Sequence, residues 1–268
     1  MVFDVSLPLA LFLITLAILF LYAKYEGRIR SLLGGKELRL RDVILLVVAM
    51  GLMVTIIVFI PQVAILVFFL SAYSLVLFLF TYLISQKWYL GIISPALFIS
   101  LYLLFRETDA WNIYLLNLFA VVFAIFVSIY LGSLFTWKTT AAFVTLLTLM
   151  DIIHVFGTKF MPASAEKAIG LQLPMMIVLS TFPSEGRIML GLGDIFLFGL
   201  LAIQTTQRYG RKFGLTSVMV MTVVFLLLET VLLNFAFGYF PATVMVICGW
   251  LAALGIRYLY ESLVFKSG

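Results

Sequence analysis

The sequence predicts an all-α protein that crosses a membrane several times, and its composition leads to this conclusion. Hydrophobic residues make up 65% of the chain and charged residues 11%, and the mean hydropathy is +1.23. A soluble domain carries about a quarter charged residues, and no soluble fold of this length could bury so much apolar surface. Lipid must therefore solvate most of the chain.

Nine apolar runs are long enough to cross the hydrocarbon core as helices, which takes roughly 20 residues. We expect membrane helices over 5–23, 43–60, 63–85, 88–105, 113–136, 139–158, 188–207, 216–237 and 241–260. No Lys or Arg precedes the first run, so we expect it to be retained rather than removed as a signal peptide. The chain is divided into an N-terminal membrane bundle, 1–138, and a C-terminal bundle, 139–268.

Basic residues predict the orientation of the chain. They follow the first, third, fifth, seventh and ninth runs, which places them on one side if nine helices span. Because Lys and Arg favour the cytoplasmic side, we expect the N-terminus outside and the C-terminus in the cytoplasm. Topology also accounts for the net charge of +5 without a nucleic-acid partner. The residues are Lys24, Arg28, Arg30, Lys36, Arg39, Arg41, Lys87, Lys138, Arg208, Arg211, Lys212, Arg257 and Lys266.

The segment 159–187 is predicted to be the long outer connection between the sixth and seventh helices. It mixes charges and prolines with apolar residues, so it cannot form a spanning helix. Its apolar part, 171–179, is too short to span and is expected as a strand or a re-entrant segment covered by protein. We expect the segment to be partly disordered without substrate and able to add a strand beside an unwound one.

Carboxylates within membrane helices are costly and are therefore functional candidates. Three qualify, namely Asp151, Asp194 and Glu229. Asp151 lies seven residues before Thr158, and Asp194 lies seven residues after Arg187. At 1.5 Å per residue, both lie roughly 10 Å below the outer surface. Adjacent antiparallel helices would present these two carboxyl groups at one level.

Such a pair is suited to peptide hydrolysis. Two close carboxylates in a dry site do not both ionise readily, so the pair is expected to share one proton. The ionised group can take a proton from water while the protonated group polarises a peptide carbonyl. For Glu229 we favour a hydrogen-bonded contact between helices, and His154 is interpreted as a polar residue near the boundary. Gln204 and Asn234 are interpreted as interhelical hydrogen-bonding groups.

Glycines precede the second aspartate in Gly191-Leu192-Gly193-Asp194. They leave room for a helix or a substrate backbone to approach, although this pattern alone fits a helix-packing patch equally well. The only cysteine, Cys248, and the only histidine, His154, do not form a cluster. We therefore expect no metal, no cofactor and no internal disulfide.

Four segments resemble the signal peptide peptidase family, and the last is also similar to presenilins. They are Met150-Asp151 with Val155-Phe156-Gly157-Thr158 and Met161; Leu173-Pro174; Met189-Leu190-Gly191-Leu192-Gly193-Asp194-Ile195; and Pro241-Ala242-Thr243. Met150 stands where the family has tyrosine, and Thr243 where it has leucine in a Pro-Ala-Leu motif. The resemblance covers the C-terminal half, whereas the first five runs match only in number and hydropathy.

The resemblance implies nine spans and proteolysis within the membrane, with Asp151 and Asp194 as catalytic residues. It implies that Gly191-Leu192-Gly193 and Pro241-Ala242-Thr243 contact the substrate. The expected partners are the bilayer and transmembrane peptides with a cytoplasmic N-terminus, such as signal-peptide remnants or type II membrane proteins. A prokaryotic plasma membrane is favoured over an internal eukaryotic one.

Three alternatives remain open from the sequence. A proton-coupled transporter or channel could use Asp151, Asp194 and Glu229 as a relay, and inverted repeats would favour it. A prepilin peptidase also uses the G-x-G-D pattern, but it should cut near the cytoplasmic face. An inactive relative could bind substrates without cleaving them.

Overall fold

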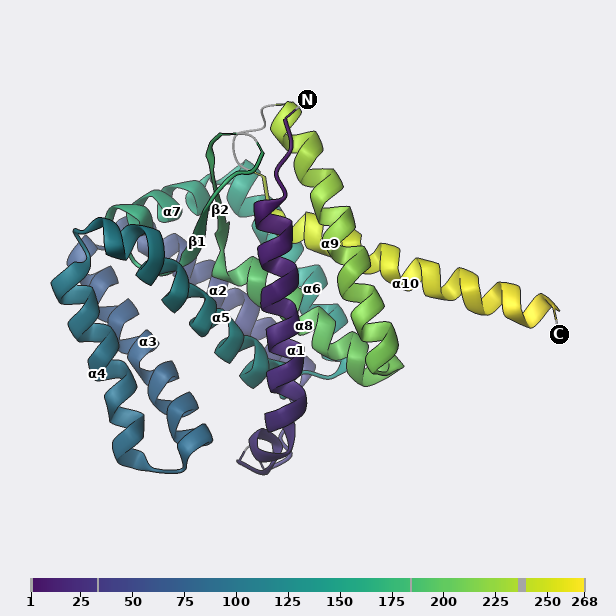
Figure 1. Cartoon of the computed structure of the whole chain (residues 1–268), viewed down its shortest axis with the longest axis horizontal. Coiled ribbons are helices and arrows are strands. Elements are labelled where there is room, and N and C mark those ends of the chain that lie inside the picture. Colours follow the sequence, from purple (N-terminus) through teal and green to yellow (C-terminus); the bar gives the residue numbers. More distant parts are fainter. Residues whose placement is uncertain (1, 33, 184, 236–239, 268) are drawn as a thin grey trace.

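A computed structural model describes residues 2–32, 34–183, 185–235 and 240–267 as a bundle of helices with one β-hairpin (Figure 1). The first half contains α1 (Ser6–Leu32), α2 (Leu40–Phe59), α3 (Gln62–Ser85), α4 (Trp88–Phe105), the π-helical turn η1 (Trp111–Leu115) and α5 (Leu116–Gly132). The second half contains α6 (Trp137–Ile152), the π-helical turn η2 (Ile153–Gly157), α7 (Phe160–Gly170), β1 (Met176–Ser180), β2 (Arg187–Gly191), α8 (Leu192–Tyr209), α9 (Arg211–Asn234) and α10 (Ala242–Ser267).

Seven of the described helices are long and apolar enough to cross a membrane: α1, α2, α3, α4, α6 with η2, α9 and α10. The protein is therefore a helical, multi-pass membrane protein, as the composition predicts. Two further helices, α5 and α8, coincide with predicted spans but fall outside this set. α5 has 17 residues, one short of the length required.

α8 is the central helix of the bundle. Eleven consecutive residues, from Ile195 to Thr205, are buried, and the helix packs against α1, α5, α6, α9 and α10. A helix buried on all sides has no face for lipid, so it tolerates polar residues. Packing is close at Gly199, where an added Cβ would lie 2.7 Å from Ile18 of α1 and 2.9 Å from Ser128 of α5.

The segment between η2 and α8 differs from two predictions. The predicted helix 188–207 begins only at Leu192, because residues Arg187–Gly191 form β2 and pair antiparallel with β1, Met176 opposite Gly191 and Ser180 opposite Arg187. The predicted disorder of 159–187 is contradicted by helix α7 over Phe160–Gly170. The expected strand within 171–179 is present as β1, and it makes the chain slightly less than all-α.

Two parts of the molecule flank this centre. α3 and α4 pack together on one side, and α10 leaves the bundle on the other (Figure 1). The buried residues divide in the same way. One hydrophobic cluster surrounds α8, and the other, rich in aromatic rings, joins α3, α4, η1 and the start of α5. The hairpin lies where the two clusters meet, because Ile177 belongs to the first and Val178 packs against the second.

Candidate active site

Asp151 and Asp194 line one cavity of about 130 Å³, which we call the dyad cavity. Asp151 lies at the end of α6, and Asp194 lies in the first turn of α8. The other lining residues come from η2, α7, β2 and the start of α10, and they are Val155, Met161, Pro162, Ala165, Met189, Leu190, Gly191, Phe240, Pro241 and Ala242. The structure thus brings together the two acids that the sequence places at equal depth.

The start of α8 places Asp194 at the cavity. Gly191 is extended, with φ −67° and ψ 148°, and serves as the N-cap. A carboxylate in the first turn of a helix interacts favourably with the helix dipole. An added Cβ on Gly191 would lie 3.5 Å from Oδ2 of Asp194, whereas one on Gly193 would meet nothing within 4 Å. Gly191 therefore borders the acid directly, while Gly193 faces open space.

A π-helical turn follows Asp151 almost at once. η2 begins at Ile153, directly after α6 ends at Ile152, and Val155 within it lines the dyad cavity. Such turns insert one extra residue and are frequent at functional sites. Asp151 is only 3% exposed, so the cavity is its access to solvent. The hydropathy of the predicted helix 139–158 contains no sign of this turn.

The electrostatics of the cavity favour a shared proton. The carboxyl groups of Asp151 and Asp194 interact electrostatically, and none of the described residues that line the cavity is basic. Two carboxylates without a counter-charge repel one another strongly at low dielectric. A single proton held between them removes that repulsion, and it leaves one group able to accept a proton and the other able to donate one.

The predicted substrate-contacting residues divide into two sets. Gly191, Pro241 and Ala242 line the dyad cavity. Leu192 packs into the hydrophobic cluster around α8, and Gly193 is exposed. Thr243 is not among the residues that line the cavity.

Thr243 is the polar group of α10 nearest the acids. Its side chain is 2% exposed and lies beside the carboxyl group of Asp151. Its Oγ1 has no hydrogen-bond partner of normal geometry among the described residues. A buried hydroxyl is usually paired, and the carboxyl group of Asp151 is the described group that interacts with this one.

One wall of the cavity is tied to the first half of the chain. α7 contributes three lining residues, and its Lys167 Nζ donates to the carbonyl oxygens of Ile57, Val58 and Ile60 at 3.2, 2.5 and 3.2 Å. These carbonyls lie at the end of α2, where a helix leaves its last acceptors unpaired. Lys167 therefore caps α2 and holds α7 in place.

Glu229 lies apart from the dyad cavity. It is 4% exposed, and neither carboxyl oxygen has a partner among the described residues, so the predicted hydrogen-bonded helix contact is wrong. Glu229 interacts instead with the segment that precedes α1. The acidic group that interacts with it, Asp4, already accepts hydrogen bonds from the backbone N–H groups of Ser6, Leu7 and Phe182.

The other predicted polar residues have structural contacts. His154 lies beside Gly51 of α2, and its ring meets Phe160 edge-on at 6.3 Å. Asn234 bonds both backbone groups of Val2, so it joins α9 to the N-terminal segment rather than to a second helix. Neither residue lines the dyad cavity.

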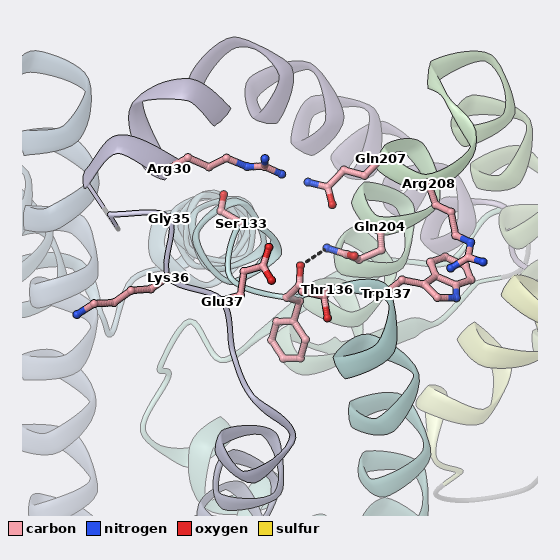
Figure 2. Close-up of a pocket in the computed structure, with 11 residues that line it drawn as sticks. Arg30, Gly35, Lys36, Glu37, Ser133, Thr136, Trp137, Gln204, Gln207 and Arg208 are labelled. Carbon is pink, nitrogen blue, oxygen red and sulfur yellow. Dashed lines mark hydrogen bonds between the residues drawn. The ribbon is translucent and has the colours of Figure 1, made fainter.

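A larger cavity, about 360 Å³, lies at the opposite end of α6 and α8 (Figure 2). Gln204 lies there, ten residues or about 15 Å beyond Asp194 along α8. Its amide donates to the carbonyl oxygens of Gly132 and Phe135 at 3.1 and 2.9 Å, which confirms the predicted interhelical role.

Two of the charged groups around this basic-end cavity have protein partners. Arg30 forms an ion pair with Glu26 at 3.0 Å, and Arg208 stacks over the ring of Trp137 at 4.6 Å, as Figure 2 shows. The cavity is lined by one acid, Glu37, rather than by a pair. The dyad cavity is therefore the candidate active site.

No protein-family model matches this chain, and no curated protein is similar to it in sequence. A function for the protein therefore depends on the residues of the site and their geometry.

Proposed function

We propose that this protein is an intramembrane aspartyl protease of the signal peptide peptidase and presenilin type, with Asp151 and Asp194 as its catalytic pair. One observation carries the proposal: two carboxyl groups, from α6 and α8, line a single cavity without a basic lining residue. An uncompensated acid pair is unfavourable for a purely structural contact, but it is the arrangement that general acid–base catalysis by two carboxyl groups requires.

The chemistry follows from one shared proton. The ionised aspartate accepts a proton from water as the water oxygen attacks the peptide carbonyl carbon, and the protonated aspartate donates its proton to the carbonyl oxygen. The resulting gem-diol collapses when its C–N bond breaks. The amine nitrogen takes a proton from one aspartate, and the other regains the proton of a diol hydroxyl, so the pair returns to its starting state.

The hairpin offers a backbone template beside the aspartates. Leu192 N–H donates to Met175 C=O and Thr181 N–H donates to Gly186 C=O, both at 3.1 Å. With this register, Gly191 and Met189 of β2 face outward and line the dyad cavity, and Gly191 is also the N-cap of α8, which leaves Met189 as the strand residue. Its N–H and C=O are free among the described residues and could bind an unwound substrate as a third strand.

The spans and orientation form part of the proposal. We infer nine membrane helices, adding α8 and the joined η1 and α5 to the seven apolar helices, because all nine lie within one bundle. Positive charge at the end opposite the acids would place that end in the cytoplasm. The expected substrates then have a cytoplasmic N-terminus, as signal-peptide remnants and type II membrane proteins do, and a prokaryotic plasma membrane is the favoured location.

The transporter alternative has weaker support. A relay needs Glu229 to exchange protons with the aspartates, yet Glu229 does not line their cavity and its charged neighbour is Asp4. The position of the acids, at the end of the bundle away from the basic residues, also disfavours a prepilin peptidase.

The proposal is tested with the full chain in lipid nanodiscs and a transmembrane peptide whose products are measured by mass spectrometry. Asp151→Asn and Asp194→Asn should each lower turnover at least about a thousandfold, while thermal unfolding stays unchanged. Glu229→Gln is the matched control and should retain activity. Equal loss in Glu229→Gln would favour the relay, and cleavage by both Asn variants would overturn the proposal.

A further inference from the structure

The first edge of the hairpin, that of β1, is closed by a side chain from the first half of the chain. Asn117 of α5 accepts a hydrogen bond from Val178 N–H and donates one to Val178 C=O, both at 2.7 Å. Val178 lies opposite Met189 in the register, so both residues direct their backbone groups away from the partner strand. One edge of the sheet therefore carries Asn117, and the other faces the dyad cavity.

The chemistry of this contact is specific to an amide. A residue in a strand offers one N–H and one C=O on the same side, and a neighbouring strand satisfies both. Among uncharged side chains, Asn and Gln carry a donor and an acceptor in this spacing. Asn117 thus occupies the place of one residue of a neighbouring strand, and it leaves no room there for a substrate backbone.

The segment that leads into β1 is held by the same part of the chain. Tyr102 Oη of α4 donates to Leu171 C=O at 2.8 Å, and Trp111 Nε1 of η1 donates to Gln172 C=O at 2.9 Å. Both rings are 0% exposed within the aromatic cluster. The hairpin is therefore fixed to α5, which in turn packs along α8, the helix that carries Asp194.

We propose that Asn117 is a positioning residue that closes the β1 edge, so that a substrate strand can add only at β2 beside the aspartates. Strands lie about 4.8 Å apart, so a peptide added at β1 would lie three spacings, or roughly 14 Å, from one added at β2. A peptide bound at β1 could not reach the acids. Closing that edge prevents unproductive binding, and fixing the hairpin to α5 sets which peptide bond meets the dyad. This role rests on the proposed proteolysis.

The test compares Asn117→Leu with Asn112→Leu in nanodiscs. Asn112 and Asn117 both line a cavity of about 540 Å³ beside the hairpin. The side chain of Asn112 is exposed and has no hydrogen bond among the described residues. Asn117→Leu should lower kcat/KM at least about tenfold and spread cleavage over several neighbouring bonds, as mass spectrometry of the products measures. Asn112→Leu should cleave the wild-type bond at the wild-type rate. Asn117→Gln, which keeps the amide, should restore most of the single-bond cleavage.

Hydrogen exchange gives a second measurement that needs no activity. The amide of Val178 should exchange at least about tenfold faster in Asn117→Leu and unchanged in Asn112→Leu. Faster exchange with wild-type cleavage would overturn the positioning role. If the wild type cleaves no peptide, the proposed protease function fails, and unchanged exchange at Val178 in Asn117→Leu would then overturn the closed edge separately. If Asn117→Leu does not fold, the Gln variant decides. Cleavage of several neighbouring bonds by Asn117→Gln, which keeps the amide, would overturn the role.

Discussion

The hydrogen bonding of several buried polar groups differs between the two ends of α8. At the basic end, Gln204 donates to two carbonyl oxygens, and Thr205 Oγ1 accepts from Trp250 Nε1 at 2.9 Å. At the dyad end, the Thr243 hydroxyl and the His154 Nδ1 have no partner among the described residues. Because an unpaired buried group is costly, its presence indicates a role in something other than folding.

Each end also has a residue of the opposite kind. Thr140, in the second turn of α6, is buried at the basic end and also lacks a hydrogen-bond partner within the described chain. Lys167 is fully engaged at the dyad end. The difference is therefore clearest between Gln204 and Thr243, and three substitutions can test it.

The largest effect is expected for Thr243→Val. The variant keeps the shape of the side chain but removes a hydroxyl that could donate to Asp151 or to the attacking water. A hydrogen bond to a charged group contributes about 1.5–3 kcal/mol, so kcat should fall roughly 10- to 100-fold while KM and the thermal midpoint stay constant. Thr243→Ser should keep most of the activity. Wild-type turnover in the Val variant would mean that the unpaired hydroxyl has no catalytic role.

Gln204→Leu should have the opposite signature. The change leaves the carbonyl oxygens of Gly132 and Phe135 without their donor, which should destabilise the protein by about 1–3 kcal/mol. Thermal unfolding in detergent should detect this loss, and activity per folded molecule should be unchanged. Gln207→Leu, one turn away on the exposed side of α8, removes one exposed amide's hydrogen bond to the Tyr22 hydroxyl and should cost less. Equal midpoints for the two variants would contradict a structural role for Gln204.

The smallest effect is expected for His154→Phe. His154 has an unpaired nitrogen but does not line the dyad cavity, and phenylalanine preserves the edge-on contact with Phe160. The activation free energy and the free energy of unfolding should each change by less than about 0.5 kcal/mol, the usual range for sites without special contacts. A tenfold loss of activity would show that an unpaired group can contribute to catalysis without lining the dyad cavity.

Hydropathy and spacing predicted much of this architecture. Each of the nine apolar runs overlaps a helix, although the seventh begins with β2. The equal predicted depth of Asp151 and Asp194 agrees with their shared cavity. α7 also had a local sign in the sequence, since Pro162 lies in its first turn and alanines follow.

The remaining features depend on tertiary contacts. The residues of β2 continue into the apolar run of α8, so hydropathy alone assigned them to the helix; only pairing with β1 makes them a strand. The turn η2 and the burial of Thr243 depend on neighbouring helices in the same way. Asn117 lies in an apolar run where an amide indicates a polar contact, but its partner, Val178, lies 61 residues away.

The burial of α8 has a consequence for how the protein is made. A segment enters the bilayer from the translocon according to its own hydrophobicity, and α8 is not among the helices apolar enough to do so alone. The helix that carries Asp194 must therefore be drawn in by neighbours already present, such as α1, α5 and α6. Synthesis thus delivers Asp151 in a self-inserting helix and Asp194 in a dependent one, so the two acids meet only after the rest of the bundle can receive α8. Under the proposed protease function, a partly made chain would therefore lack a complete catalytic pair.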